Sequence, residues 1–231
     1  MTQNDERGPK PRRPRCRPAP REAADPMGST GGDRAARHPT APVPKQRTPG
    51  PYRVPPRERR TGLVLLNTGD GKGKTTAALG TLLRARGREM TVAMLQFLKT
   101  EGVRRGEHIA AETLGVEIVP MGAGFTWLSE RIEEDRALAR ECWAQCREVL
   151  DSGRYDVVIF DELTYPLAYG WLEHDEVLPV IRDRPAGTHV VITGRMATPE
   201  LVDFADLVTE MKEVKHPYRT RGIGAQPGLE L

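Results

Sequence analysis

Apolar residues along the chain follow two alternating patterns. Compact runs of Val, Ile and Leu, which are typical of strands buried on both faces of a sheet, occupy residues 63–67, 91–95, 116–119, 156–160, 188–193 and 207–211. Apolar residues recurring every three or four positions indicate helices over residues 75–86, 109–114, 129 to about 150, 174–182 and 199–204. A polar loop is expected over 100–108, an aromatic-rich connection over 165–171 and an irregular segment over 212–231. Alternating strands and helices predict an α/β fold with a mostly parallel sheet covered by helices on both faces.

The first 60 residues differ in composition from the rest. They hold 13 of the 20 prolines, 15 Lys and Arg against 6 Asp and Glu, and almost no aliphatic or aromatic residues. Such a segment cannot bury a core, so we predict a disordered Pro/Arg-rich tail over residues 1–60 and one folded domain over 61–231. Two alternatives stay open for the tail: an Arg-rich arm for nucleic acid or another polyanion, and an extension without a role from a non-native translation start.

Several classes of protein are excluded by what the sequence lacks. Its three cysteines, Cys16, Cys142 and Cys146, form neither a disulfide framework nor a metal-ligand pattern. No run of about 18 apolar residues predicts a membrane span, and the N-terminus has no apolar core of a secretory signal. We therefore expect no membrane partner and a cytoplasmic location.

A glycine-rich loop joins the first predicted strand to the first predicted helix, within LVLLNTGDGKGKTTAAL at 63–79. In this layout, backbone N–H groups and a helix N-terminus bind phosphate oxygens. A Lys in the loop reaches the phosphates and a following hydroxyl binds Mg²⁺. The predicted phosphate-binding residues are Gly69, Asp70, Gly71, Lys72, Gly73, Lys74, Thr75 and Thr76. The strict motif has Gly where this chain has Thr68, which indicates a specialised subclass; a plain glycine-rich turn is the structural alternative.

Polar side chains also follow three other predicted strands. Gln96, the pair Asp161-Glu162 and Arg195 each lie at such a strand end. Because the carboxyl ends of parallel strands meet at one edge of a sheet, we expect these groups to lie near the glycine loop. One carboxylate would hold Mg²⁺ and the other could bind metal or act as a base, while Arg195 could clamp phosphate. A surface acidic pair and a solvated arginine are the plainer alternatives.

Two large aromatics flank Thr126 in the loop at 121–127. In most proteins Phe125 and Trp127 would be core residues. At a ligand-binding edge they could instead form a flat hydrophobic platform.

These features together resemble the phosphate-loop family of ATP:corrinoid adenosyltransferases. The similar segments are TGDGKGKTTAALG (68–80), LQFLK (95–99), GVEIVPMGAGFTW (115–127), YDVVIFDELTYPLAYGWL (155–172) and VVITGRMATPELVDFADLVTEMKEVKHPYR (190–219). The resemblance implies a three-layer fold of the P-loop NTPase (RecA-like) type, and the altered glycine loop is that family's own form.

The resemblance also implies an activity. Such an enzyme transfers the 5′-deoxyadenosyl group of ATP to the Co(I) centre of a reduced corrinoid and releases inorganic triphosphate, in cobalamin biosynthesis. Lys74 and Glu162 are implied as catalytic, Thr75 with Glu162 or Asp161 as ligands of Mg²⁺ or Mn²⁺, and Phe125 with Trp127 as the pair that displaces the lower axial ligand of cobalt. An electron-donating flavoprotein and a homodimer are the implied partners.

This chain departs from the family pattern in two places. Its segment at 49–62 is too proline-rich for the long N-terminal helix that often closes over the family's site. The turn after Lys99 lacks the usual Asn and Trp and keeps only Gly106-Glu107.

Two other functions compete with the adenosyltransferase. A nucleic-acid-dependent NTPase of recombinase-like fold would explain the basic tail, although nucleic acid is not the partner we expect. A non-catalytic carrier of corrinoid or nucleotide would need no turnover.

Overall fold

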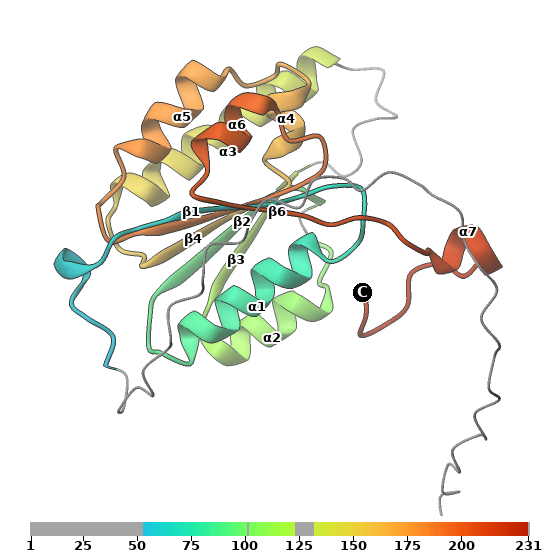
Figure 1. The fold of residues 1–231 in the computed structure, drawn as a ribbon, viewed down its shortest axis with the longest axis horizontal. Coiled ribbons are helices and arrows are strands. Elements are labelled where there is room, and N and C mark those ends of the chain that lie inside the picture. The colour runs from blue at the N-terminus through green and yellow to red at the C-terminus, as the bar shows by residue number, and fades with distance from the viewer. Residues whose placement is uncertain (1–52, 101, 123–131, 231) are drawn as a thin grey trace, which may run out of the picture. The chain divides into compact units, whose positions relative to one another are not determined.

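Six parallel strands form one sheet in the order β3-β2-β4-β5-β1-β6 (Figure 1). The computed structural model describes residues 53–100, 102–122 and 132–230. The strands are β1 (Val64–Thr68), β2 (Val92–Thr100), β3 (Glu117–Gly122), β4 (Val157–Asp161), β5 (His189–Thr193) and β6 (Leu207–Glu210). All registers between neighbours are parallel, so the predicted parallel sheet is confirmed.

Helices cover both faces of this sheet, as Figure 1 shows. One face carries α1 (Lys74–Arg86) and α2 (Gly106–Leu114), and the other carries α3 (Ile132–Asp151), α4 (Thr164–Ala168), α5 (His174–Arg182) and α6 (Pro199–Phe204). A short 3-10 helix, η1 (Arg57–Arg59), precedes β1, and α7 (Pro217–Arg221) follows β6. The predicted three-layer α/β fold is therefore confirmed. None of the helices in the described ranges is long and apolar enough to span a bilayer.

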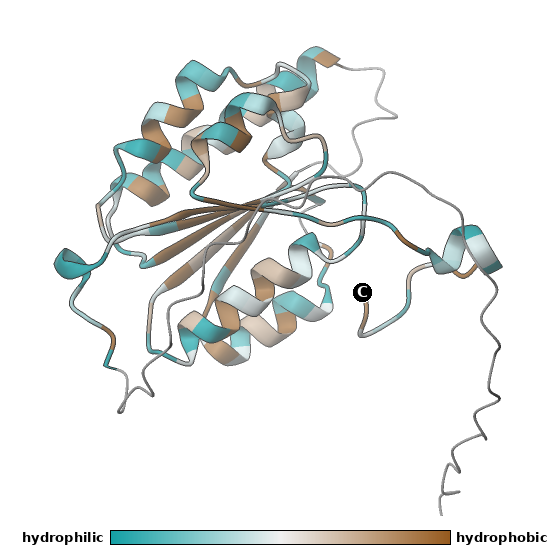
Figure 2. Ribbon diagram, viewed as in Figure 1, coloured by the Kyte–Doolittle hydropathy of each residue, from teal (hydrophilic) through white to brown (hydrophobic). Residues whose placement is uncertain are grey.

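Alternate residues of each central strand enter two separate cores. In β4, Val158 and Phe160 pack with α3, α4 and α5, whereas Val157 and Ile159 pack with α1 and α2. This alternation follows from the two-residue period of a strand. Figure 2 shows the hydrophobic residues concentrated in the strands and on the helix faces toward the sheet.

The three predicted connections each contain helical residues. The polar loop is confirmed only over residues 102–105, and the C-terminal segment is irregular only outside α7. Strand β2 continues to Thr100 and α2 begins at Gly106, where a loop over 100–108 was expected. The early start of α2 has a local cause, because the backbone N–H of Arg105 donates to Nδ1 of His108 at 3.0 Å. The aromatic connection contains α4, and α7 begins where Nδ1 of His216 accepts from the N–H of Tyr218.

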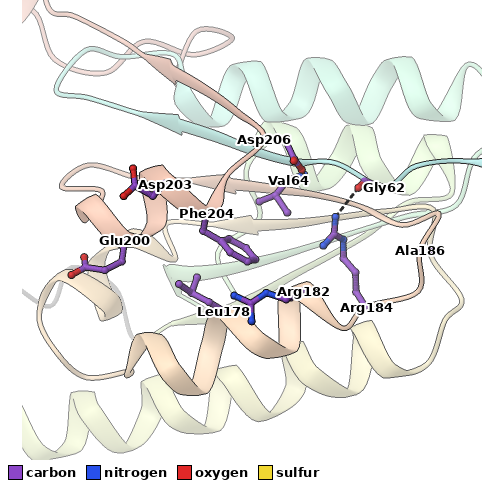
Figure 3. Close-up of a pocket in the computed structure, with 10 residues that line it drawn as sticks. All are labelled: Gly62, Val64, Leu178, Arg182, Arg184, Ala186, Glu200, Asp203, Phe204 and Asp206. Atoms are coloured by element: carbon purple, nitrogen blue, oxygen red, sulfur yellow. Dashed lines mark hydrogen bonds between the residues drawn. The ribbon is translucent and has the colours of Figure 1, made fainter.

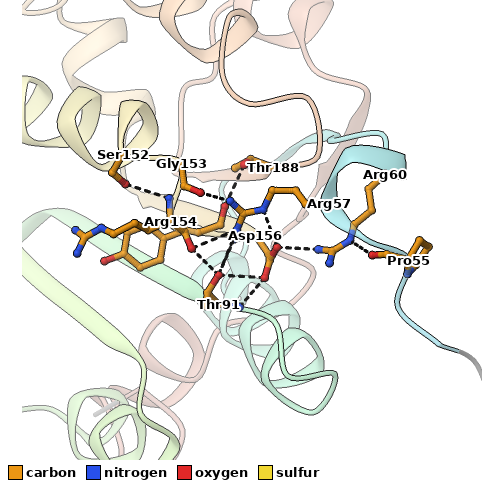
Figure 4. Close-up of polar contacts among 10 residues, drawn as sticks. Pro55, Arg57, Arg60, Thr91, Ser152, Gly153, Arg154, Asp156 and Thr188 are labelled. Carbon is orange, nitrogen blue, oxygen red and sulfur yellow. Dashed lines mark hydrogen bonds and ion pairs between the residues drawn. The ribbon is translucent and has the colours of Figure 1, made fainter.

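A buried carboxylate, Asp156, organises the amino-terminal edge of the sheet (Figure 4). Arg57 Nε and Arg60 Nη1 donate to its Oδ1 at 2.9 and 2.8 Å. The backbone N–H and hydroxyl of Thr91 donate to its Oδ2 at 2.8 and 3.0 Å. These bonds hold residues 57–60 against the sheet, N-terminal to the predicted start of the domain at 61. The predicted tail otherwise stays a prediction, because residues 1–52 are outside the described ranges.

Candidate active site

The glycine loop and the carboxyl ends of the strands border a cleft of about 1030 Å³. Its walls come from the loop, from the first turns of α1 and α2, from the segment after β4, and from the end of the chain. The lining residues with polar or charged side chains are Asp70, Lys72, Lys74, Thr75, Thr76, Lys99, Glu107, Glu162, Tyr165, Arg195 and Glu230. The topology thus gathers most of the predicted site residues in one place.

The glycine loop is packed tightly against the segment that follows β6. The N–H of Gly71 donates to the carbonyl of Met211 at 2.6 Å. A Cβ added to Gly69 or to Gly71 would lie 2.6 Å from that same oxygen, which is closer than any ordinary contact. Gly73 adopts a φ of 109° immediately before α1 begins, a conformation that glycine tolerates best. Glycine is therefore required at these positions by space and by backbone geometry.

The side chain of Lys74 folds back against the glycine loop that precedes it. Its ammonium group donates to the carbonyl oxygens of Gly69 and Gly71, both at 2.7 Å. Burial lowers the pKa of Lys74, and the positive charge of Arg195 lowers it further. Lys72 instead forms an ion pair through its ammonium group with Glu230, which also lines the cleft, at 2.9 Å. Two cations thus border the part of the cleft where backbone N–H groups would bind a polyphosphate.

Asp161 connects three elements beneath the cleft. The fully buried carboxylate accepts at Oδ1 from the hydroxyls of Thr75 and Thr193, at 2.9 and 2.6 Å. At Oδ2 it accepts from the side-chain amide of Gln96 at 3.1 Å. Because β5 lies between β1 and β4 in the sheet, Thr193 at the end of β5 fills the gap between the glycine loop and Asp161. The carboxylate thereby orients the Thr75 hydroxyl.

Glu162 is the opposite case, since one oxygen of its carboxylate accepts no hydrogen bond within the described residues, although Lys74, Lys99 and Arg195 lie near its charge. Its backbone has a positive φ of 65°, which is costly for a non-glycine residue, and its N–H donates to Thr193 Oγ1 at 3.0 Å. Burial raises the pKa of Glu162 to about 7, with the neighbouring charge of Asp161 as the next cause. Its Oε2 is buried and accepts no hydrogen bond in the described structure. A buried acceptor of this kind, in a cleft lined by cations, suits a metal ion or a ligand donor.

A resident cation at this point fits the chemistry of the groups present. The hydroxyl of Thr75 and the carboxylates of Asp161 and Glu162 are hard oxygen donors, the type that Mg²⁺ prefers. Within the described ranges, no cluster of three or more His, Cys, Asp or Glu side chains could hold a metal by itself. Mg²⁺ commonly uses one or two protein carboxylates together with phosphates and waters, so the donor set suits a cation that arrives with a nucleotide.

Some predicted residues do not line the cleft. Gln96 is fully buried and bonds Asp161 and His108, so its predicted contact with nucleotide stays a prediction. Phe125 and Trp127 lie outside the described residues, and their predicted role stays untested.

The sequence reasoning missed His108, Tyr165 and Glu230. Burial, followed by the charge of Glu162, raises the pKa of Tyr165 to about 12. Tyr165 lay three residues beyond the acidic pair, which was a usable signal; His108 and Glu230 gave none.

A second cavity, of about 640 Å³, opens at the amino-terminal edge of the sheet between α5 and α6 (Figure 3). Arg184 there donates to the backbone carbonyls of Gly62, Ile181 and Thr188. Because all three bonds are made to backbone carbonyls, we infer that Arg184 stabilises the fold at this edge of the sheet. Ligands of open α/β sheets bind at the carboxyl ends of the strands, so the cleft at the glycine loop is the candidate active site.

Comparison with known proteins identifies the kind of enzyme that carries this cleft. The sequence model of the family "ATP:corrinoid adenosyltransferase BtuR/CobO/CobP" matches residues 60–231. The chain belongs to this family. The resemblance drawn from the glycine loop and the segments around Glu162 is thereby confirmed, and the protein is a transferase of the ATP:corrinoid adenosyltransferase family.

Curated relatives agree over most of the chain. The corrinoid adenosyltransferase of Escherichia coli (strain K12) is 39% identical over 178 residues, which are 77% of this chain and 90% of the relative. Corrinoid adenosyltransferase CobA of Salmonella typhimurium (strain LT2) matches with the same identity and coverage. The corrinoid adenosyltransferase of Pseudomonas aeruginosa (strain PAO1) is 40% identical over 172 residues, 74% of this chain and 84% of the relative.

Proposed function

We propose that this protein transfers the 5′-deoxyadenosyl group of ATP to the Co(I) centre of a reduced corrinoid and releases inorganic triphosphate. Family membership over residues 60–231 is the observation that carries the proposal. The cleft agrees with it, because loop N–H groups and two lysines border a position for a polyanion. Glu162 also lines the cleft, and its Oε2 accepts no hydrogen bond among the described residues.

In this reaction the protein does not have to activate a nucleophile. The corrinoid substrate brings a cobalt centre that attacks C5′ of ATP, and the C–O bond to the triphosphate breaks. The protein has to hold C5′ in line and stabilise the charge that develops on the leaving triphosphate. Lys72, Lys74 and Arg195 can supply positive charge for that, together with the backbone amides of residues 69–76 other than that of Gly71, which is bonded to Met211.

Mg²⁺ or Mn²⁺ would be held by Thr75 and Glu162, with Asp161 behind them. Both oxygens of Asp161 already accept hydrogen bonds, whereas Oε2 of Glu162 accepts none among the described residues. Glu162 is therefore the proposed direct ligand and Asp161 the group that orients Thr75. A bound cation would neutralise part of the triphosphate charge.

Phe125 and Trp127 are proposed to pack under the corrin ring and displace the lower axial ligand of cobalt. That step would make Co(II) easier to reduce by an electron-donating flavoprotein. A homodimer and a cytoplasmic location complete the proposal, on the family resemblance alone.

A product assay tests the proposed activity. The full chain is mixed with ATP, Mg²⁺ and chemically reduced cobalamin, and both products are measured. We expect a light-sensitive Co–C bond and one triphosphate for each adenosyl group transferred. Release of ADP and phosphate without alkylated corrinoid would contradict the proposal, and a single equivalent of product without turnover would indicate a carrier.

The aromatic pair has its own test. Replacing Phe125 or Trp127 by Ala should impair reactions that start from Co(II) by at least about 10-fold more than reactions that start from pre-formed Co(I). Equal losses from both starting states would contradict the axial-ligand role.

A further inference from the structure

A chain of hydrogen bonds runs from α2 to the centre of the candidate metal site. Nδ1 of His108 accepts from the backbone N–H of Arg105 at 3.0 Å, and Nε2 of His108 lies 2.8 Å from Oε1 of Gln96. The amide nitrogen of Gln96 donates to Asp161, which accepts at its other oxygen from Thr75. Gln96 and Asp161 are fully buried, and His108 is nearly so.

The partners fix the direction of every bond in this chain. An ionised Asp161 can only accept, so the amide nitrogen of Gln96 must face it and the amide oxygen must face His108. Since Nδ1 of His108 accepts from Arg105, the ring proton of a neutral His108 lies on Nε2 and points at Gln96. Each group therefore has a single arrangement, and each holds the next one in place.

We propose that His108 is a positioning residue for the binding of ATP with Mg²⁺. It acts through Gln96 to fix Asp161, and Asp161 fixes the hydroxyl of Thr75. The same side chain ties this network to the first turn of α2, where Gly106 and Glu107 line the cleft. The ligand follows from the proposed function, on which this inference rests. Groups that orient metal ligands typically change metal affinity or activity by about 10- to 100-fold when they are removed.

Calorimetry of ATP binding without corrinoid tests the role, since no turnover occurs. Each variant is titrated with ATP in Mg²⁺ and, separately, in EDTA. We expect His108→Ala to weaken binding in Mg²⁺ by about 10-fold or more and to change binding in EDTA far less. Equal losses in both conditions, or no loss in either, would overturn the proposal.

Two conservative variants separate the relay from a purely local role in starting α2. In His108→Gln, the amide nitrogen can replace Nε2 and donate to Gln96; in His108→Asn, the amide oxygen can replace Nδ1 and accept from Arg105. The relay predicts that Gln restores affinity in Mg²⁺ to within about 3-fold and that Asn does not. Rescue by Asn but not by Gln would show that His108 only caps the helix.

A matched control comes from the other face of the sheet. Nε2 of His174, at the start of α5, lies 2.7 Å from the hydroxyl of Thr198, and His174 does not line the cleft. His174→Ala should leave the affinity for ATP in Mg²⁺ unchanged; a loss equal to that of His108→Ala would overturn the proposal.

Coupling to Gln96 gives one more check. His108→Ala should add little to the loss caused by Gln96→Ala, because both break the same chain, and fully additive losses would count against it. If the wild-type chain binds ATP neither in Mg²⁺ nor in EDTA, the proposed function fails. That outcome is distinct from every variant result above.

Discussion

Two carboxylates at opposite ends of β4 have been given opposite surroundings. Asp156 precedes the strand and accepts four hydrogen bonds, two of them from arginines. Glu162 follows the strand, and its buried Oε2 accepts none in the described structure. Burial tends to raise the pKa of Asp156, but bonds from Thr91 and Arg57 outweigh it and the pKa is lowered. Burial is not outweighed at Glu162, and its pKa rises to about 7.

The comparison separates a carboxylate that stabilises the fold from one that is left for a ligand. A charge that is paired inside the protein has no capacity left for substrate, whereas an unpaired buried charge costs stability and attracts a cation. We infer that Asp156 serves the fold and Glu162 serves the reaction. Four predictions test this division.

The largest effect is expected from Glu162→Gln. Without the carboxylate, the rate of adenosyl transfer should fall by about 10³-fold, while the free energy of unfolding should stay the same or rise, because a poorly paired buried charge has been removed. Initial rates of Co–C bond formation and urea unfolding measure the two quantities. An unchanged rate in Glu162→Gln would show that the carboxylate of Glu162 takes no part in the reaction.

The second prediction concerns pH and the chain without metal or nucleotide. The pKa of Glu162 is raised from 4.5 to about 7, so the folded chain binds a proton that the unfolded chain has lost. The resulting stabilisation is complete below about pH 4.5 and is lost as pH rises through about 7. The free energy of unfolding should therefore fall by up to about 3 kcal/mol between pH 5 and pH 8. Urea unfolding in EDTA at a series of pH values measures this fall. In Glu162→Gln, the contribution of Glu162 to the pH dependence of the free energy of unfolding should disappear.

Asp156→Asn should have effects opposite to those of Glu162→Gln, with a loss of stability and no loss of activity. It leaves Arg57 and Arg60 without their carboxylate and should lower the free energy of unfolding by about 2 kcal/mol at pH 7. Because the folded pKa of Asp156 is depressed, its stabilisation is present above about pH 4 and is lost as pH falls through the folded pKa. The variant and the wild type should therefore converge in stability in acid. The rate of adenosyl transfer at pH 7 should be unchanged, and a large loss of rate would contradict the division.

The smallest effects are expected from the two arginines. Arg57→Ala and Arg60→Ala should each lower the free energy of unfolding by about 1 kcal/mol, since both are partly exposed and share one oxygen of Asp156. The double variant should lose more than the sum of the two single losses, because in each single variant the remaining arginine still pairs with Asp156 and partly compensates. Urea unfolding of the three variants gives the coupling energy, and strict additivity would show that the two do not share Asp156.

Much of the fold could be predicted because the relevant signals are local. Runs of apolar residues located all six strands, and the rule that strand ends meet at one edge brought Glu162, Arg195 and the glycine loop together. The same reasoning could not assign Gln96 its bonds to Asp161 and His108, because these pairings join residues 65 and 12 positions apart.

Other features depend on contacts that no short window of sequence contains. Met211 lies 140 residues beyond Gly71, to which its carbonyl is bonded. The environment of Asp156 depends on Arg57 and Arg60, which composition assigned to the tail. The separation of Asp161 from Glu162 into a satisfied and an unsatisfied carboxylate needs the strand order, since Thr193 reaches Asp161 only because β5 lies between β1 and β4.

The bond between Gly71 and Met211 also bears on how the protein is made. The glycine loop leaves the ribosome well before the backbone that supports it, because Met211 is synthesised 140 residues after Gly71. Strand β1 likewise lies between β5 and β6, so neither neighbour exists when β1 appears. Pairings between such distant residues form slowly. A nascent chain that stops before residue 211 would carry the whole glycine motif without the support that shapes it, and the ability to bind nucleotide should therefore arise only after residue 211 has been synthesised.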